Sequence, residues 1–337
     1  MRDSMKYFRC HKIPLLYTLG GVFFLLAFLL GVSLGSTNAS VFEMLGDLLR
    51  GEDTTAARIF LYVRFPRTVA AFLCGAALSL SGAVLQRVLA NRLASPSIIG
   101  VNAGAGLAVT LAAAFGMLGG WRVSLLAFLG AFLSAMLVSV GAKRFGASRG
   151  TVILMGVAMN ALLGAFSDAI TVFFPTVAVD RLDFKVGSFS AVTYAKLIPA
   201  AVIILFASLL VFTLSKELEV LSLGDDHARG LGLPSDGMRV LFLLLSALLA
   251  GASVSIAGLL SFVGLLVPHA LRRFLRSGRH FLPLCFLFGG AFVSLSDTLA
   301  RTVVAPFELP VGIIMAFLGA PFFLFILIKR KGGEHRA

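Results

Sequence analysis

Apolar runs long enough to cross a lipid bilayer recur along almost the whole chain, and they limit its fold more than any other feature. A helix needs about 20 apolar residues to cross the hydrocarbon core, and only helices and closed barrels satisfy their backbone groups there. Because the runs are continuous, they predict spanning helices. The ten expected spans, of which the eighth is short, are residues 13–34, 65–86, 97–115, 121–142, 151–174, 194–214, 239–257, 259–272, 281–300 and 310–329.

Composition supports a membrane protein with one domain. The chain has 337 residues, of which 58% are hydrophobic and 13% charged, whereas soluble domains carry roughly 25% charged residues. No polar block between the runs is large enough to fold alone, so we expect a single all-α domain over residues 1–337. The first run follows four basic residues, as in a signal peptide. It exceeds the roughly 7–15 residues of a signal peptide's apolar core, however, and is predicted to be the first span.

The basic residues indicate how the chain is oriented. The net charge of +13 would suggest nucleic-acid binding in a soluble protein, but here Lys and Arg form short clusters between apolar runs, and no nucleic acid is expected. With ten spans both ends lie on one side, and that side carries 20 of the 29 Lys and Arg residues. Since cytoplasmic loops are enriched in Lys and Arg, we predict a multi-pass protein of the cell (inner) membrane with both termini in the cytoplasm.

The sequence lacks motifs for covalent chemistry. It contains no HExxH zinc motif, no nucleophile elbow and no phosphate-binding GxxxxGK[ST] loop. The three cysteines, Cys10, Cys74 and Cys285, are odd in number and far apart, so neither a disulfide framework nor a metal site follows. We therefore expect no enzyme activity and no bound cofactor, and any ATP must be hydrolysed by a partner subunit.

Small residues recur every four positions in two of the predicted spans. Such ladders let helix backbones approach closely, although Gly and Ala are also simply common in membrane helices. The two ladders are Ala71, Gly75, Ser79 and Ala83, and Ala247, Gly251 and Ser255.

The longest predicted cytoplasmic loop, residues 216–239, contains helix-forming pieces interrupted by Gly and Pro. We expect two short helices joined by a turn, with Gly230 and Gly232 supplying backbone angles that a side chain would resist. A loop with its own structure outside the membrane favours a docking surface for a partner. An amphipathic hairpin that lies on the membrane without a partner is the alternative.

Three arginines are predicted on the outer side, against the inside bias of positive charge. Arg64 and Arg67 flank Pro66 before the second span, and Arg301 ends the ninth. Guanidinium groups bind carboxylates through paired hydrogen bonds, so an outward cluster would receive an acidic partner or an anionic substrate. Snorkelling to lipid headgroups is the alternative.

Two aspartates fall inside predicted spans, where an ionised side chain must face protein or a water-filled cavity. Asp168 is a candidate for lining a translocation path. Asp297 could instead pair with Arg301 one helical turn later.

Five segments in this order resemble the FecCD-type permeases, the bacterial ABC importer channels for iron siderophores, heme and vitamin B12. The resemblance covers nearly the whole chain. It implies the type II ABC importer fold, a homodimer of ten-helix subunits around a central path, two ATP-binding subunits on the cytoplasmic side, and a periplasmic or lipid-anchored substrate-binding protein outside. The segments are RFPR at 64–67, SGAVLQRVLANRLASPSIIGVNAGA at 81–105, SLGDDHARGLGLP at 222–234, GLLSFVGLLVPHALR at 258–272 and ELPVGIIMAFLGAPFFLFIL at 308–327.

The resemblance also implies roles for the two charged regions. Arg64, Arg67 and Arg301 match arginines that meet glutamates of the binding protein. The residues that match the helices seated in the ATPase are Gly224, Asp225, Asp226, Ala228, Arg229, Gly230, Leu231 and Gly232.

A cytoplasmic gate is implied in the loop after the second span. Its residues match Asn91 and Leu93, and a second gate layer falls near Ser148. Relatives usually read Asn-Pro-Leu at the first layer, whereas Arg92 occupies the middle position here. The local backbone of this gate therefore departs from the family pattern.

These observations predict the membrane subunit of a binding-protein-dependent ABC importer that carries an iron chelate inward. A ferric siderophore is the expected cargo, with heme or cobalamin as alternatives. An ion-coupled secondary transporter is a rival that would need no ATPase and commonly shows inverted repeats, of which no clear pair is visible. A non-transporting membrane receptor or scaffold is a third possibility, which stimulation of the ATPase by loaded binding protein would distinguish.

Overall fold

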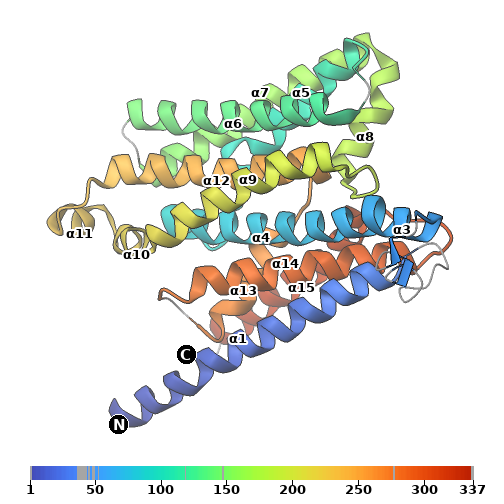
Figure 1. Ribbon diagram of the computed structural model, residues 1–337. Helices are drawn as coiled ribbons and strands as arrows, with labels where there is room; N and C mark the ends of the chain where they lie inside the picture. Colours follow the sequence, from blue (N-terminus) through green and yellow to red (C-terminus); the bar gives the residue numbers. More distant parts are fainter. Residues whose placement is uncertain are drawn as a thin grey trace.

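The computed structural model is a bundle of helices (Figure 1). It describes residues 2–35, 53–117, 119–145, 148–275 and 278–334, together with residues 44, 46, 47, 50 and 51. In chain order the elements are α1 (Arg2–Ser33), α3 (Thr55–Ile59), the π-helical turn η1 (Phe60–Arg64), α4 (Phe65–Val88), the 3-10 turn η2 (Pro96–Ile99), α5 (Val101–Ala114), α6 (Gly120–Arg144), α7 (Arg149–Phe173), the 3-10 turn η3 (Pro175–Val177), α8 (Ala178–Val186), α9 (Tyr194–Thr213), α10 (Ser215–Ser222), α11 (Asp225–Gly230), α12 (Ser235–Ala257), α13 (Val263–Arg272), α14 (Phe281–Thr302) and α15 (Val311–Glu334).

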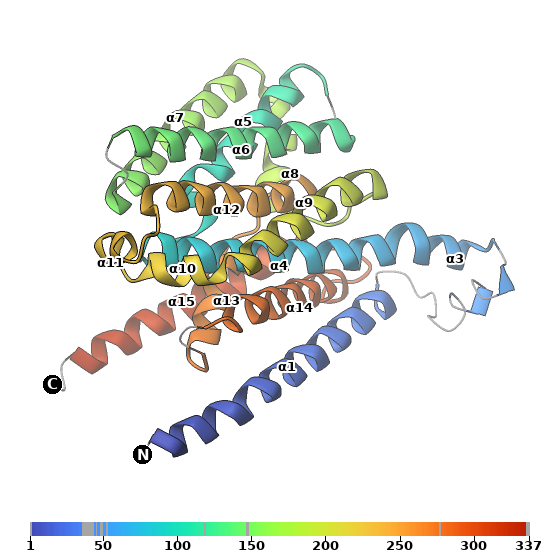
Figure 2. The ribbon, with the colours of Figure 1, turned by 60° about the vertical axis from the view of Figure 1, so that its left-hand side comes forward.

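Helix α4 lies at the centre of the bundle. Nearly all of its residues are buried, because α14, α12, α13 and α9 all pack against it. Helices α5, α6 and α7 form a layer beyond α12, and α1 packs on α14 at the opposite side (Figures 1 and 2). The molecule is therefore layered around one buried helix.

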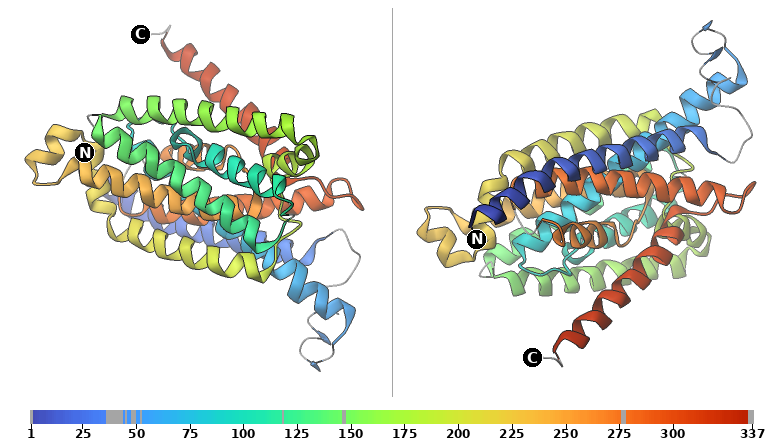
Figure 3. Two further views of the ribbon diagram at one scale, coloured as in Figure 1. Left: turned by 90° about the horizontal axis from the view of Figure 1, so that it is seen from above. Right: turned by 90° about the horizontal axis from the view of Figure 1, so that it is seen from below.

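The two ends of the bundle carry different elements. Helices α10 and α11 lie at the end that also holds both chain termini, called here the inner end, and α3 and α8 lie at the opposite, outer end (Figures 1 and 2). The last turns of α15 extend away from the bundle (Figure 3). Both termini thus lie at one end, as an even number of crossings requires.

The ten predicted spans correspond to helices, but not all of these are long enough to cross a bilayer alone. Seven helical stretches of the described residues have the necessary length and apolar character, and α5 and the apolar part of α15 are shorter. Helix α13 has only 10 residues, about 15 Å of helix at 1.5 Å per residue. The expectation of ten spans is therefore met only in part, because the chain runs in non-helical conformation before α5 and before α13.

The connection from α12 to α13, residues 258–262, forms no helix. Irregular backbone is tolerated at membrane depth only where other protein groups bind its polar atoms. Here the N–H of Leu259 donates to the Phe184 carbonyl at 2.9 Å, and the N–H of Ser188 donates to the Ala257 carbonyl at 2.8 Å. These bonds tie the connection to α8 and the residues that follow it.

The break before α5 is held by side chains of two other helices. Asn160 in α7 donates from Nδ2 to the Ser97 carbonyl at 2.8 Å, and Ser134 in α6 donates to the Gly100 carbonyl at 2.9 Å. Gly156, one turn before Asn160, lies directly against the backbone of η2. These contacts replace helical hydrogen bonds that the break lacks.

The predicted small-residue ladders lie at helix contacts. In α4, Gly75 and Ser79 lie against Gly289 of α14, and a Cβ at either glycine would overlap the neighbouring helix. In α12, Gly251 lies against Ala131 of α6. The close packing predicted from the ladders is confirmed.

We expect Gly156→Ala to destabilise the protein, since the added methyl group would overlap the Ile98 carbonyl oxygen. Overpacking of this kind costs about 1–3 kcal/mol. Gly164→Ala in the same helix is the matched control, because no atom lies within 4 Å of its Cβ position. Thermal unfolding of the purified protein in detergent compares the two variants, and equal midpoints would contradict the contact between α7 and η2.

Candidate functional site

The outer arginines lie in a cluster with two carboxylates. The guanidinium of Arg67 in α4 donates to both oxygens of Asp297 in α14 at 3.0–3.2 Å and to Glu308 at 2.6 Å. Arg301 Nε lies 3.3 Å from the same Asp297 carboxylate. Together with Arg64, these residues are called the outer cluster.

The outer cluster also closes the end of α1. The last carbonyl groups of a helix have no partner within the helix, and the helix dipole favours positive charge there. Arg64 Nη1 donates to the carbonyls of Val32 at 3.2 Å and Ser33 at 2.7 Å. Arg301 Nη2 donates to the Gly31 carbonyl at 2.9 Å. Arginines from η1 and α14 thus fix the point where α1 meets the core.

The prediction of exposed, outward-facing arginines is wrong about exposure. Arg64, Arg67 and Arg301 are 2%, 5% and 2% exposed. The physical reason is that Asp297 and Glu308 pair with Arg67, and Asp297 also with Arg301, which lowers the free-energy cost of burying these arginines. The alternative pairing of Asp297 with Arg301 one turn later is confirmed. Glu308 lies in the loop beyond α14, outside any helical spacing, so no sequence pattern links it to Arg67.

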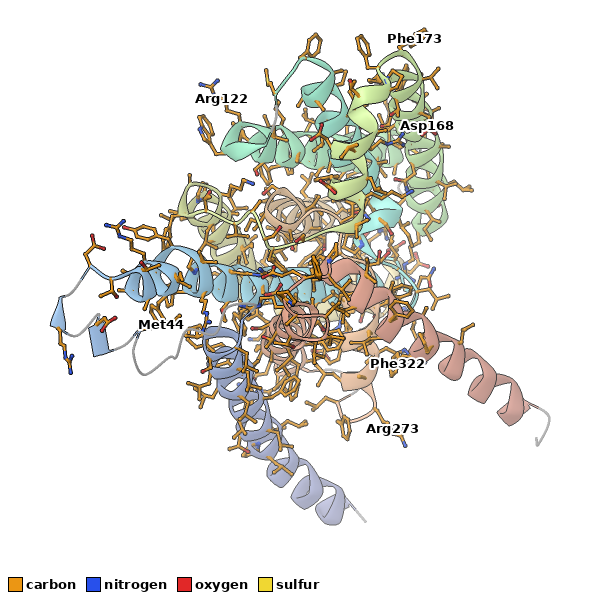
Figure 4. All side chains as sticks on the ribbon, turned by 90° about the vertical axis from the view of Figure 1, so that its right-hand side faces the viewer. Met44, Arg122, Asp168, Phe173, Arg273 and Phe322 are labelled. Carbon is orange, nitrogen blue, oxygen red and sulfur yellow. The ribbon has the colours of Figure 1, made fainter. Side chains whose placement is uncertain are left out.

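Asp168 in α7 pairs with an arginine from the next helix. Arg181 in α8 donates to Asp168 Oδ1 at 2.6 Å and to Thr171 Oγ1 at 3.0 Å. The Asp168 side chain is 70% exposed, and Figure 4 shows it near the edge of the molecule on the same side as Phe173. Asp168 lies near the end of α7, and the guanidinium of Arg181 balances its charge there.

The inner-end loop contains two short helices, α10 and α11, as predicted. Gly224 between them has φ +119° and Gly232 after α11 has φ +80°, which are values that other residues resist. Gly230 has no such angle, and nothing lies within 4 Å of its Cβ position. The expectation for Gly230 is therefore wrong, because this residue still belongs to α11 and the chain turns at Gly232.

Ion pairs hold this loop in shape. Arg239 in α12 pairs with Asp225 and lies 3.8 Å from Asp236, while Arg229 donates to Asp236 at 3.2 Å. Ala228 is fully buried. Asp225, Ala228 and Arg229 therefore maintain the loop itself. The exposed members of the predicted docking set are Asp226, Arg229, Gly230, Leu231 and Gly232.

The predicted gate residues lie where α4 ends and α7 begins. The Asn91 side chain accepts a hydrogen bond from the Leu93 N–H at 2.9 Å, and Leu93 is 50% exposed. Arg92 is also exposed. Ser148 caps α7 by accepting a hydrogen bond from the Thr151 N–H at 3.0 Å. Local hydrogen bonds thus define the backbone at both positions.

The side chains that could bind a metal ion do not gather at one place in the described part of the chain. Cys74 and Cys285 are buried and free, and the side chain of Cys10 lies outside the described part. Within the described ranges no three His, Cys, Asp or Glu side chains come together in the way that a metal site requires.

Comparison with known proteins gives consistent matches along the chain. Residues 23–329 match the FecCD transport family. The chain is 33% identical to the Fe(3+)-citrate import system permease protein YfmD of Bacillus subtilis (strain 168), over 94% of this chain and 95% of that protein. It is also 33% identical to the hemin transport system permease protein HmuU of Yersinia pestis, over 91% and 95%. A solved structure described as an inward-facing, metal-chelate type ABC transporter has a TM-score of 0.81 and 29% identity, over 94% of this chain and 99% of that one.

We expect Asp297→Asn to destabilise the protein strongly, because Arg67 and Arg301 would stay buried without their shared counter-charge. Removing one partner of a buried ion pair costs about 3–5 kcal/mol. Asp53→Asn is the control, since Asp53 pairs with Arg58 in full exposure and exposed pairs contribute little. Thermal unfolding in detergent is the measurement. A midpoint for Asp297→Asn that matches the control would show that the outer cluster does not stabilise the fold.

Proposed function

The chain belongs to the FecCD transport family, and from this premise we propose that it is the membrane-spanning subunit of a binding-protein-dependent ABC importer for an iron chelate. The family match over residues 23–329 carries the proposal. Relatives named for Fe(3+)-citrate, hemin and vitamin B12 import support a metal chelate or related cofactor as cargo. Within this range we propose a ferric siderophore, with heme and cobalamin as the alternatives.

The chain would form a channel and leave ATP hydrolysis to two separate subunits. The exposed, rigid loop at the inner end supports a docking role for α10 and α11. Leu223 and Leu231 are 61% and 68% exposed in this loop. The ion pairs of Arg229 and Arg239 hold the loop in one shape. Exposed apolar side chains on a preformed loop are typical of a protein-binding surface.

Two copies of the chain would enclose the translocation path. Helix α7 supports this arrangement because most of its residues are unburied in the single chain, including apolar Leu162 and Phe166. The ion pair that Asp168 of α7 forms with Arg181 of α8 would face the water-filled path. Asn91, Leu93 and Ser148 at the inner end would form the gate, as proposed from the resemblance.

A substrate-binding protein would dock at the outer end. The three arginines of the outer cluster are buried, so they would act mainly through their electric field. Guanidinium groups gathered at this end of the bundle would steer an acidic partner toward it over several ångströms. Direct contact with glutamates of the binding protein would require Arg64, Arg67 or Arg301 to leave its present partners.

We expect Arg64→Gln to weaken capture of the binding protein several-fold at low salt, with a smaller effect at physiological salt because ions screen the field. Arg144→Gln removes the same charge from the exposed inner end of α6 and is the matched control. Binding-protein affinity in nanodiscs is the measurement. Affinities that equal the control's at both salt concentrations would remove the outer cluster from docking.

We expect the double change Gly224→Val and Gly232→Val to abolish uptake and stimulated ATP hydrolysis together, since a β-branched residue resists both backbone angles. Gly230→Val is the control at a position without such an angle. Uptake in a strain lacking its own permease, with pull-down of the ATPase, tests this.

Normal uptake by the double variant would exclude the loop from coupling, and uptake without any ATPase would favour an ion-coupled secondary transporter. ATPase stimulation without cargo movement would favour a receptor or scaffold.

A further inference from the structure

Two arginines share one aromatic ring at the inner end of the bundle. Arg87 lies in the last turn of α4, and its guanidinium carbon is 4.9 Å from the centre of the Phe281 ring. Arg272 ends α13, and its guanidinium carbon is 5.7 Å from the same centre. Phe281 is fully buried at the start of α14. Two positive charges, called here the inner arginine pair, therefore converge between α4, α13 and α14.

The inner arginine pair lacks the counter-charge that the outer cluster has. Neither arginine forms an ion pair within the described part of the chain. Arg87 is only 9% exposed, and its Nη2 has no hydrogen-bond partner there. Glu219 in α10 attracts it from beyond ion-pair distance, whereas Arg87 and Arg92 both repel Arg272. Because an unbalanced buried cation is strongly disfavoured, this position favours an anion.

The surface next to the pair has the composition of a membrane interface. Phe274 in the turn from α13 to α14 is 62% exposed, and Arg273 and Arg279 are exposed in the same turn. Figure 4 shows Arg273 at the edge of the molecule, between α1 and α15. The hydroxyl oxygen of Tyr17 in α1 lies 3.3 Å from Nδ1 of His280 at the end of the turn. Aromatic and basic side chains gather at the level of lipid headgroups, and the neighbouring α1 is apolar and largely unburied.

We propose that the inner arginine pair binds the phosphate group of an anionic phospholipid. Guanidinium groups bind phosphate oxygens through charge-assisted hydrogen bonds, and basic pockets between membrane helices bind lipid headgroups. Arg272 is partly exposed and meets the phosphate first, while Arg87 supplies its free Nη2 from the buried side. The acyl chains lie against α1 and Phe274.

The position of the pair favours lipid over other anions. Helix α11, which belongs to the proposed ATPase-docking loop, projects from the inner end of the bundle (Figure 1). Helix α10 of the same loop packs on α4, but the pair lies against the start of α14, next to the turn that contacts α1. A free phosphate ion would gain nothing from exposed Phe274 or from the apolar face of α1. The inference does not depend on the cargo or on the direction of transport.

The test uses the full chain in nanodiscs of phosphatidylcholine, with or without added phosphatidylglycerol. Thermal midpoints and native mass spectrometry report stability and retained lipid. We expect phosphatidylglycerol to raise the midpoint of the natural sequence and to remain bound. Arg87→Met should lose both responses and should be at least as stable as the natural sequence in phosphatidylcholine alone, because an unbalanced buried charge is gone. Arg272→Gln should weaken the response, and Arg144→Gln, the matched loss of charge elsewhere at the inner end, should keep it.

Several outcomes would overturn the proposal. One is a natural sequence whose midpoint is the same in both lipid mixtures, and another is an Arg87→Met variant that still responds to phosphatidylglycerol. Equal stabilisation by inorganic phosphate in phosphatidylcholine discs would assign the site to a soluble anion. Lower stability of Arg87→Met than of the natural sequence in phosphatidylcholine would show that groups of the protein itself already balance the charge of Arg87. An intact lipid response with loss of the ATPase in pull-down would assign Arg87 to the ATPase interface.

Discussion

Every backbone polar group inside the hydrocarbon core must find its partner within the protein, and helices meet this requirement by themselves while the connections between them do not. Helix α4 is buried on nearly all sides, so its neighbours must come close, and Gly75 and Gly289 permit that contact. The same requirement governs the non-helical connections before α5 and α13. Asn160, Ser134 and the end of α8 supply hydrogen bonds to these connections.

The low dielectric constant of the core also distinguishes the two charged regions. At the outer end Asp297 and Glu308 pair with Arg67 and Arg301, and Arg64 and Arg301 bind the last carbonyl groups of α1. At the inner end Arg87 and Arg272 lie against one ring, and neither forms an ion pair with a carboxylate among the described residues. The presence of an opposite charge nearby, more than exposure, therefore distinguishes charged residues that stabilise the fold from charged residues that favour a ligand.

The roles proposed for the inner-end loop and for α7 follow from the ion pairs of the loop and from the low burial of α7. The inner-end loop is small, exposed and held by ion pairs, which suits a surface that must transmit motion to a partner without deforming. Helix α7 is long and mostly unburied and carries the ion pair of Asp168, which suits a surface that faces a path or a second copy. In the proposed function each of these surfaces would be covered by another subunit.

The sequence by itself determined the fold class, the family resemblance and the two-helix loop. Hydrocarbon thickness acts on each apolar run separately, and Gly and Pro interrupt helices locally, so neighbouring residues suffice for these predictions. Only the tertiary structure decided which charged residues are buried and what they contact. Arg67 meets Glu308 and Asp168 meets Arg181 through the packing of separate elements, and Leu259 before α13 donates to Phe184 in α8. Such contacts join residues far apart in the chain, and their distances depend on how all the helices pack together.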